Sequence, residues 1–239
     1  MKNLIKHKEI MFNIKNLFLI LFGLAMFICC KDDSIIPEKD SEELVISDYI
    51  IANSDKYSQF GKLLENTGLS NLLSIRGPYT LLLPSDEAFN AYCAEKNVSS
   101  VSDFDIEFQK KIVYNHLVTT EIQSGDIGLG SLRQENALGD KIATEFHGSD
   151  TYFNKSAKLI KRDIKTANGY IHIIDKVIDV ITLNAYQKIA SLPEFSIFTK
   201  GLELTGIKDT LETVEFDYGN KKARTRFTIL GVSDSVFNS

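Results

Sequence analysis

The chain contains a partial repeat of its own sequence, which limits the folds that it can adopt. Residues 51–73 align with 189–211, and 79–90 align with 227–238, with identical amino acids at close to half of the positions in each pair. The two aligned segments lie further apart in the second copy, which implies an insertion there, and 216–221 has the composition of a hairpin tip. We therefore expect one complete unit at 44–181 and a truncated second copy at 183–239.

Residues 1–29 have the composition of an export signal. Four lysines precede an unbroken apolar run at 17–28, whose length is typical of a signal peptide and too short to span a bilayer. The run leads into Cys29 and Cys30, and this junction resembles a bacterial lipoprotein signal, in which the peptidase cuts before a cysteine that then carries the lipid. We expect lipidation of Cys30, because a cut before Cys30 places the small residue Cys29 just before it. A cut before Cys29 would place the larger Ile28 there. Lipidation of Cys29 and an ordinary secretory signal are the alternatives.

Residues 30–43 follow the signal and are expected to form a tether, because they contain a proline and several acidic residues without apolar periodicity. The segment begins with Lys31, Asp32 and Asp33, which is similar to the short acidic tag that sends some Gram-negative lipoproteins to the cell surface. The sequence therefore indicates an outer membrane lipoprotein that contacts the membrane through its N-terminal lipid and faces the cell surface. The periplasmic face is the alternative.

The overall composition is that of a globular, acidic protein. Hydrophobic residues make up 44% of the chain and only 4 prolines are present, so a packed core is expected. The chain has 27 basic and 32 acidic residues, and without residues 1–29 the net charge falls from -5 to -8. This balance excludes nucleic acid as an expected partner. Without the signal and a lipidated Cys30, only Cys93 remains as a thiol, which excludes an intrachain disulfide and favours a small buried side chain.

The order of the predicted elements is helices first and strands later. Helical spacing of apolar residues predicts a helix that ends at Gly68, and 78–84 predicts a buried strand followed by a helix capped by Ser85. A further amphipathic helix is expected at 106–117. Four strands are expected after it, at 142–146, 152–153, 159–160 and 171–177. The fold class is therefore predicted to be α+β.

Three segments carry a family resemblance. Residues 78–89 (PYTLLLPSDEAF) predict a strand leading into a capped helix, 113–118 (VYNHLV) hold a tyrosine and a histidine, and 168–178 (NGYIHIIDKVI) predict a closing strand. In this order they resemble the motifs of the fasciclin-like domain, an extracellular adhesion and binding module. The resemblance implies a β-sandwich wedge with packed helices at 44–181 and an incomplete second fasciclin-like domain at 183–239.

The resemblance also supplies candidate binding residues from the three motifs: Thr80, Asp86, His116, Asn168, Gly169, His172 and Asp175. In animal relatives, binding is attributed to the tyrosine–histidine region and to Asp-Ile segments, which occur here at 126–127 and 163–164. A structural interpretation is ranked first for both histidines, as buried imidazoles held by the backbone or by Asp86 or Asp175. No metal is expected, because a third converging ligand is missing.

The sequence favours a protein without catalytic activity. It has no Gly-x-Ser-x-Gly elbow and no His-Glu-x-x-His motif, and 128–130 lacks the third glycine of a dinucleotide loop, so no cofactor is expected. The function expected is that of a lipid-anchored cell-envelope adhesion or ligand-binding module for an extracellular protein or glycan. The alternative is a carbohydrate-binding accessory lipoprotein of a glycan-uptake system, with Tyr152 and Phe153 as exposed contacts. Residues from about Thr182 onward are expected to lack partners for their apolar side chains.

Overall fold

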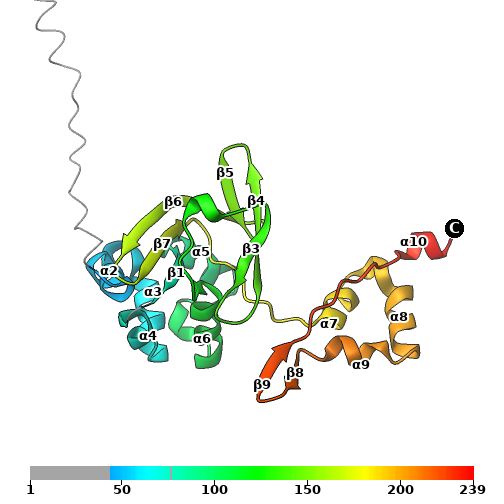
Figure 1. The fold of residues 1–239 in the computed structure, drawn as a ribbon. Helices are drawn as coiled ribbons and strands as arrows, with labels where there is room; N and C mark the ends of the chain where they lie inside the picture. The colour runs from blue at the N-terminus through cyan, green and yellow to red at the C-terminus, as the bar shows by residue number, and fades with distance from the viewer. Residues whose placement is uncertain (1–43, 76) are drawn as a thin grey trace, which may run out of the picture. The chain divides into compact units, whose positions relative to one another are not determined.

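The computed structural model describes residues 44–75 and 77–239 (Figure 1). The predicted signal peptide, Cys30 and the tether at 30–43 lie outside the described residues, so those expectations stay predictions. None of the described helices has the length and apolar character needed to cross a lipid bilayer.

Three helices open the first unit: α2 (Ile46–Ala52), α3 (Ser54–Thr67) and α4 (Ser70–Ser74). Helix α3 is kinked at Tyr57, whose backbone is not helical, and it buries Phe60, Leu63 and Leu64 at the predicted spacing. It ends at Gly68, where φ is 70°, a left-handed conformation that glycine adopts without steric cost. The helix predicted from these residues is confirmed.

Strand β1 (Tyr79–Pro84) lies inside the sheet and is buried along its whole length. It pairs in parallel with β7 (Gly169–Ile174) on one side and antiparallel with β2 (Leu117–Val118) on the other. A strand with neighbours on both edges and packing on both faces needs a continuous apolar run, which 79–84 provides. The predicted buried strand is therefore confirmed.

Two capped helices lie between β1 and β2. Helix α5 (Asp86–Glu95) begins after Ser85, whose hydroxyl accepts a hydrogen bond from the amide of Ala88, as predicted. Helix α6 (Ile106–Asn115) begins after Asp105, whose carboxylate accepts from the amide of Phe108. A short helical turn, η1 (Val101–Asp103), connects them.

The remaining strands complete a seven-stranded sheet in the order β2-β1-β7-β6-β5-β4-β3. They are β3 (Gly130–Glu135), β4 (Lys141–His147), β5 (Asp150–Phe153) and β6 (Ala157–Thr166), and the turn η2 (Ser124–Asp126) precedes them. Strand β6 pairs with β7 through two register irregularities, which bend it. A bridge between Val118 and Asn136 brings the two ends of the sheet together, so the sheet is nearly closed. The predicted α+β class is confirmed.

Two apolar cores share strand β1, because successive side chains of a strand point to opposite faces. Leu81 and Leu83 join the larger core, which includes Phe60 of α3 and Ile112 of α6. Leu82 joins the second core, which lies among the strands. The two cores hold β1 and β7 rigidly between them, and this rigidity supports the loops that leave the sheet.

The segment 183–239 is mainly helical, with α7 (Ala185–Ala190), the turn η3 (Pro193–Phe195), α8 (Ser196–Leu204), α9 (Ile207–Glu212) and α10 (Asp234–Phe237). The predicted hairpin is formed by β8 (Glu215–Tyr218) and β9 (Lys221–Arg224). Residues 227–232 align with strand β1 in sequence but do not form a second strand, because residues 225–233 form neither helix nor strand. In the first unit the equivalent strand β1 is stabilised by β2 and β7, and no such neighbours flank 225–233 among the described residues.

Candidate ligand-binding site

Asp86 of the first motif caps a helix that is distant in sequence. Its carboxylate accepts hydrogen bonds from the amide of Ser58 (3.1 Å), the hydroxyl of Ser58 (2.7 Å) and the amide of Gln59 (2.8 Å). These amides are unpaired within α3, because the kink at Tyr57 starts a new helical segment there. Asp86 therefore stabilises the part of α3 that carries Phe60, and its oxygens are engaged in that role.

His116 of the middle motif is fully buried and neutral. Its Nδ1 donates to the carbonyl of Ile112 (2.8 Å), and its Nε2 accepts from the amide of Ile178 (2.9 Å). This arrangement requires the neutral imidazole, and burial lowers the pKa of His116 to about 4 despite the hydrogen bond to Ile112. The ring joins the end of α6 to the segment after β7. Of the partners expected for it, the backbone is correct and Asp86 is wrong.

Asn115, beside His116, is a structural residue that the sequence analysis did not single out. Its side-chain amide donates to the carbonyls of Ile178 (2.9 Å) and Asp179 (3.2 Å). Its side-chain oxygen accepts from Asn136 (2.8 Å), which lies at the bridge between the two ends of the sheet. Asn115 therefore helps to close the sheet, and only the unusual presence of an asparagine between Tyr114 and His116 could have indicated it.

Asn168 and Gly169 of the closing motif hold the chain where α2, α4 and β1 meet. The side chain of Asn168 accepts from the amide of Ile46 (2.9 Å) and donates to the carbonyls of Leu73 and Ile75 (both 2.8 Å). At Gly169 φ is 149°, and a Cβ would lie 1.9 Å from the carbonyl oxygen of Tyr79. Only glycine fits there, so both residues have structural roles.

Asp175 ends the closing motif at the surface. Its carboxylate accepts a hydrogen bond from the amide of Lys158 (2.7 Å), which fastens the end of β7 to β6. It is not a partner of either buried histidine, so that part of the expectation is wrong.

Thr80 and His172 converge on one short segment. The hydroxyl of Thr80 donates to the carbonyl of Thr120 (2.7 Å) and accepts from the amide of Ile122 (2.8 Å). The Nε2 of His172 donates to the carbonyl of Ile122 (2.8 Å), while its Nδ1 accepts from the amide of Asp163 (3.1 Å). This is again a neutral imidazole, and burial lowers the pKa of His172. The first and closing motifs thus act together on residues 120–122.

Asp163 adds a third attachment to the same segment. It lies at the irregularity in β6 with φ of 59°, and its carboxylate accepts from the amide of Ser124 (2.7 Å) and from the hydroxyl of Ser124. Burial alone would raise the pKa of Asp163, but the hydrogen bonds from the side chain and the amide of Ser124 lower it. Asp163 is therefore an anchor of this segment, a role that its place in an Asp-Ile pair does not indicate.

These contacts define the 119–129 loop, the segment between β2 and the start of β3. Within this loop, the side chains of Ile122 and Ile127 are buried. Its exposed side chains are Thr119, Glu121, Gln123, Asp126 and Leu129. Leu129 is 77% exposed, and Gln123 donates to the hydroxyl of Tyr170 (3.0 Å). An exposed loop held by a rigid scaffold is the usual form of a protein-binding site.

Comparison with known proteins identifies the family to which this domain belongs. A family model described as the fasciclin domain matches residues 55–180, more than half of the chain. The chain belongs to the fasciclin family. Fasciclin domains are typically adhesion or ligand-binding modules.

Other proteins are similar to this chain over part of its length. Transforming growth factor-beta-induced protein ig-h3 of rabbit, Oryctolagus cuniculus, is 28% identical over 137 residues, which are 57% of this chain and 20% of that protein. Protein sll1483 of Synechocystis is 26% identical over 148 residues, 62% of this chain and 81% of that protein. The match thus spans about a fifth of the length of ig-h3. A solved FAS1 domain pair from the insect cell adhesion molecule Fasciclin I has 21% identity and a TM-score of 0.35, covering 66% of this chain and 54% of that chain.

Ser85, His116 and Asp175 have the residue types of a hydrolase triad, but their side chains are hydrogen-bonded to different backbone groups. No three His, Cys, Asp or Glu side chains in the described part of the chain are placed to hold a metal ion. Cys93 is buried, as predicted.

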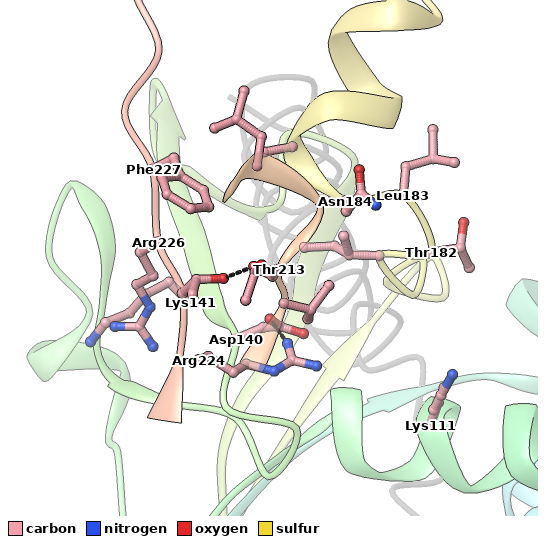
Figure 2. Close-up of a pocket in the computed structure, with 15 residues that line it drawn as sticks. Lys111, Asp140, Lys141, Thr182, Leu183, Asn184, Thr213, Arg224, Arg226 and Phe227 are labelled. Carbon is pink, nitrogen blue, oxygen red and sulfur yellow. Dashed lines mark hydrogen bonds and ion pairs between the residues drawn. The ribbon is translucent and has the colours of Figure 1, made fainter. Parts of the chain in front are cut away.

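A cavity of about 610 Å³ lies where the β3–β4 turn of the fasciclin domain meets the β8–β9 hairpin (Figure 2). Its charged lining residues are Lys111, Asp140, Lys141, Arg224 and Arg226. Arg224 forms an ion pair with Asp140, and Arg226 pairs with Glu135 at 2.6 Å. Figure 2 shows Lys111 apart from the two arginines. Because the arginines are paired with acidic side chains, they join the hairpin to the fasciclin domain and leave little charge for a ligand.

Proposed function

We propose that this protein is a non-catalytic, lipid-anchored adhesion or ligand-binding module of the cell envelope. Membership of the fasciclin family supports the binding role, and the lipoprotein-like signal at 1–30 supports the anchor. The partner is an extracellular protein, contacted through the 119–129 loop. The location is the outer membrane, with the domain facing the cell surface.

The choice of the 119–129 loop as the binding surface rests on one observation. Thr80, His172 and Asp163 come from three different strands and all bind the backbone or side chain of residues 120–124. A loop that is fixed in this way loses little conformational entropy when a partner binds. Its exposed Asp126 and Leu129 offer one charge and one apolar contact, and Asp126 belongs to an Asp-Ile pair of the kind to which binding is attributed in relatives.

The double variant Asp126→Ala with Leu129→Ala tests this surface. Both side chains are exposed, so the fold should be unaffected, and adhesion of cells displaying the variant should fall by roughly tenfold if the two are central contacts. The matched control is Asp55→Ala with Ile75→Ala, an exposed pair on another part of the domain. Adhesion is measured at equal surface amounts, and normal adhesion of the loop variant would refute the proposed surface.

The anchor has its own test. Cys30→Ala should abolish incorporation of labelled fatty acid and release the protein from the outer membrane. The double variant Cys29→Ala with Cys30→Ala distinguishes lipidation of Cys29. External protease should cleave the protein on intact cells, and protection until the outer membrane is broken would instead place it on the periplasmic face.

Carbohydrate binding is the second candidate, with a different surface. Phe153 is 0% exposed, so the expectation that it contacts a glycan is wrong. Tyr152 remains partly accessible and lies against the ring of His147, with ring centroids 4.8 Å apart and an interplanar angle of 36°. Aromatic faces at this hairpin could stack on sugar rings. A glycan array with wild type and Tyr152→Ala separates this candidate from adhesion through the 119–129 loop.

A further inference from the structure

The segment 183–239 reproduces the capping contacts of the fasciclin domain at equivalent positions. The carboxylate of Asp234 accepts from the amide of Ser196 (3.1 Å), the hydroxyl of Ser196 (2.6 Å) and the amide of Ile197 (2.9 Å). Asp86 makes the same three contacts to the start of the corresponding part of α3. The two halves of this contact come from different parts of each unit, so its recurrence reflects shared tertiary structure and not only shared sequence.

The end of the helix is reproduced as well. Gly206 has φ of 74°, and its counterpart Gly68 has φ of 70°. Before each glycine, a threonine hydroxyl donates to the carbonyl four residues earlier, at Thr205 and at Thr67. Helix α8 is therefore the counterpart of the second part of α3, from its cap to its end.

The apolar side of α8 forms an open groove. A cavity of about 670 Å³ lies along it. Its apolar lining residues are Ile197, Phe198, Leu202, Leu204, Ile207 and Phe237. Leu204 is 77% exposed and Phe237 is 52% exposed, and no described residue covers them. In the fasciclin domain, the counterpart of Phe237 is Phe89, which is 0% exposed.

The first unit shows what covers these positions. Phe60, the counterpart of Phe198, meets the edge of His116 with ring centroids 6.4 Å apart and an interplanar angle of 79°. Asn66, the counterpart of Leu204, donates to the side chain of Gln109 (3.0 Å). Gln109 lies in α6, and His116 follows directly after α6, about two helical turns further along. The groove thus presents to solvent the positions on which α6 lies in the first unit.

We propose that this groove is the docking site of an amphipathic helix of the α6 type, supplied by the closing half of a second fasciclin unit. The shape and polarity of the groove require the docked helix to differ from α6 at one position. Leu204 is apolar where Asn66 is polar, so the helix carries an apolar residue at the position of Gln109. Burial of leucine against leucine replaces the amide–amide hydrogen bond of the first unit.

Two synthetic peptides test the proposal on the purified protein. One has the sequence of residues 104–118, and the other has the same sequence with Gln109→Leu. Binding is measured by fluorescence anisotropy, and gain of helix by circular dichroism. The Gln109→Leu peptide should bind roughly tenfold more tightly than the original, because it buries an additional apolar side chain.

Variants of the protein locate the binding. Leu204→Glu should abolish binding of both peptides, whereas Leu230→Glu should not, since Leu230 is even more exposed than Leu204 but lies outside the groove. Three results would overturn the proposal: no binding to wild type, equal affinity of the two peptides, or binding that survives Leu204→Glu. A wild-type dimer that Leu204→Glu dissolves would also overturn it, because a second copy would then be the occupant.

Discussion

At the scale of single residues, the two buried histidines of the family motifs act alike. Each ring accepts a hydrogen bond from one backbone amide and donates to one carbonyl, so each is satisfied only when it is neutral. Protonation would place a donor against an amide that is itself a donor and would bury an uncompensated charge. His116 and His172 therefore stabilise the fasciclin domain only when they carry no charge.

This arrangement predicts that the domain loses stability in mild acid. The pKa of His116 is lowered from 6.5 to about 4, so the unfolded chain takes up the proton first as the pH falls. The free energy of unfolding should decrease from about pH 6.5 to about pH 4, by on the order of 3 kcal/mol from His116, and change no further from this residue below that. Urea titrations of wild type and His116→Gln measure the difference. The exposed His147→Gln serves as the control, and a wild-type profile that matches that of His116→Gln would contradict the prediction.

At the scale of elements, the stability of α3 depends on a side chain from α5. Asp86→Ala removes all three hydrogen bonds at the kink of α3, and we expect a loss of about 1–2 kcal/mol in the free energy of unfolding. Asp55→Ala changes an exposed acidic residue in the first turn of the same helix and should cost no more than about 0.5 kcal/mol. Chemical denaturation of both variants compares them directly. Equal stabilities would show that the cap contributes nothing.

The elements also show which parts of the structure could be predicted from the sequence. Helix α3 and strand β1 follow from apolar spacing, glycine and proline, which act locally. Strand β3 could not be predicted, since Leu132 is its only buried residue and its pairing with β4 is irregular. Residues 227–232 resemble β1 but form no strand, because a strand also needs neighbours that local sequence does not encode.

Only part of the candidate site could be predicted, because the local sequence does not show which residues the sheet brings together. The motif residues could be identified, but their partners could not, since Thr80 and Ile122 are brought together only by the sheet. Asp163 and Ser124 lie 39 residues apart, and the Asp-Ile pair at 163–164 does not indicate that they are in contact. The 119–129 loop is thus a product of tertiary structure.

At the scale of the whole molecule, the fasciclin domain and the segment 183–239 differ in how well their apolar side chains are covered. The domain buries most of its large apolar residues in two cores, whereas Tyr218 and Leu230 of the later segment, which lie outside the groove along α8, are 74% and 87% exposed. Exposed apolar side chains of this size promote association. The segment should therefore add self-association, and not stability, to the domain.

A chain that ends at Ile181 tests this expectation. Its thermal midpoint should be at least that of the full chain, and light scattering should show a smaller tendency to associate. Aggregation or unfolding of the shorter chain, with a monomeric full chain, would mean that 183–239 is an integral part of the fold and that the boundary near Thr182 is wrong.

The parallel pairing of β1 with β7 has a consequence for how the domain is made. Thr80 faces Tyr170, which comes much later in the chain, and the backbone partners on that edge of β1 come from 168–174. During synthesis, β1 emerges long before β7 and has an apolar surface and an unsatisfied edge until the last strand arrives. The domain cannot complete its central sheet piece by piece from the N-terminus. Its folding is a late event with a high contact order, and the nascent chain depends on whatever shields 79–84 in the meantime.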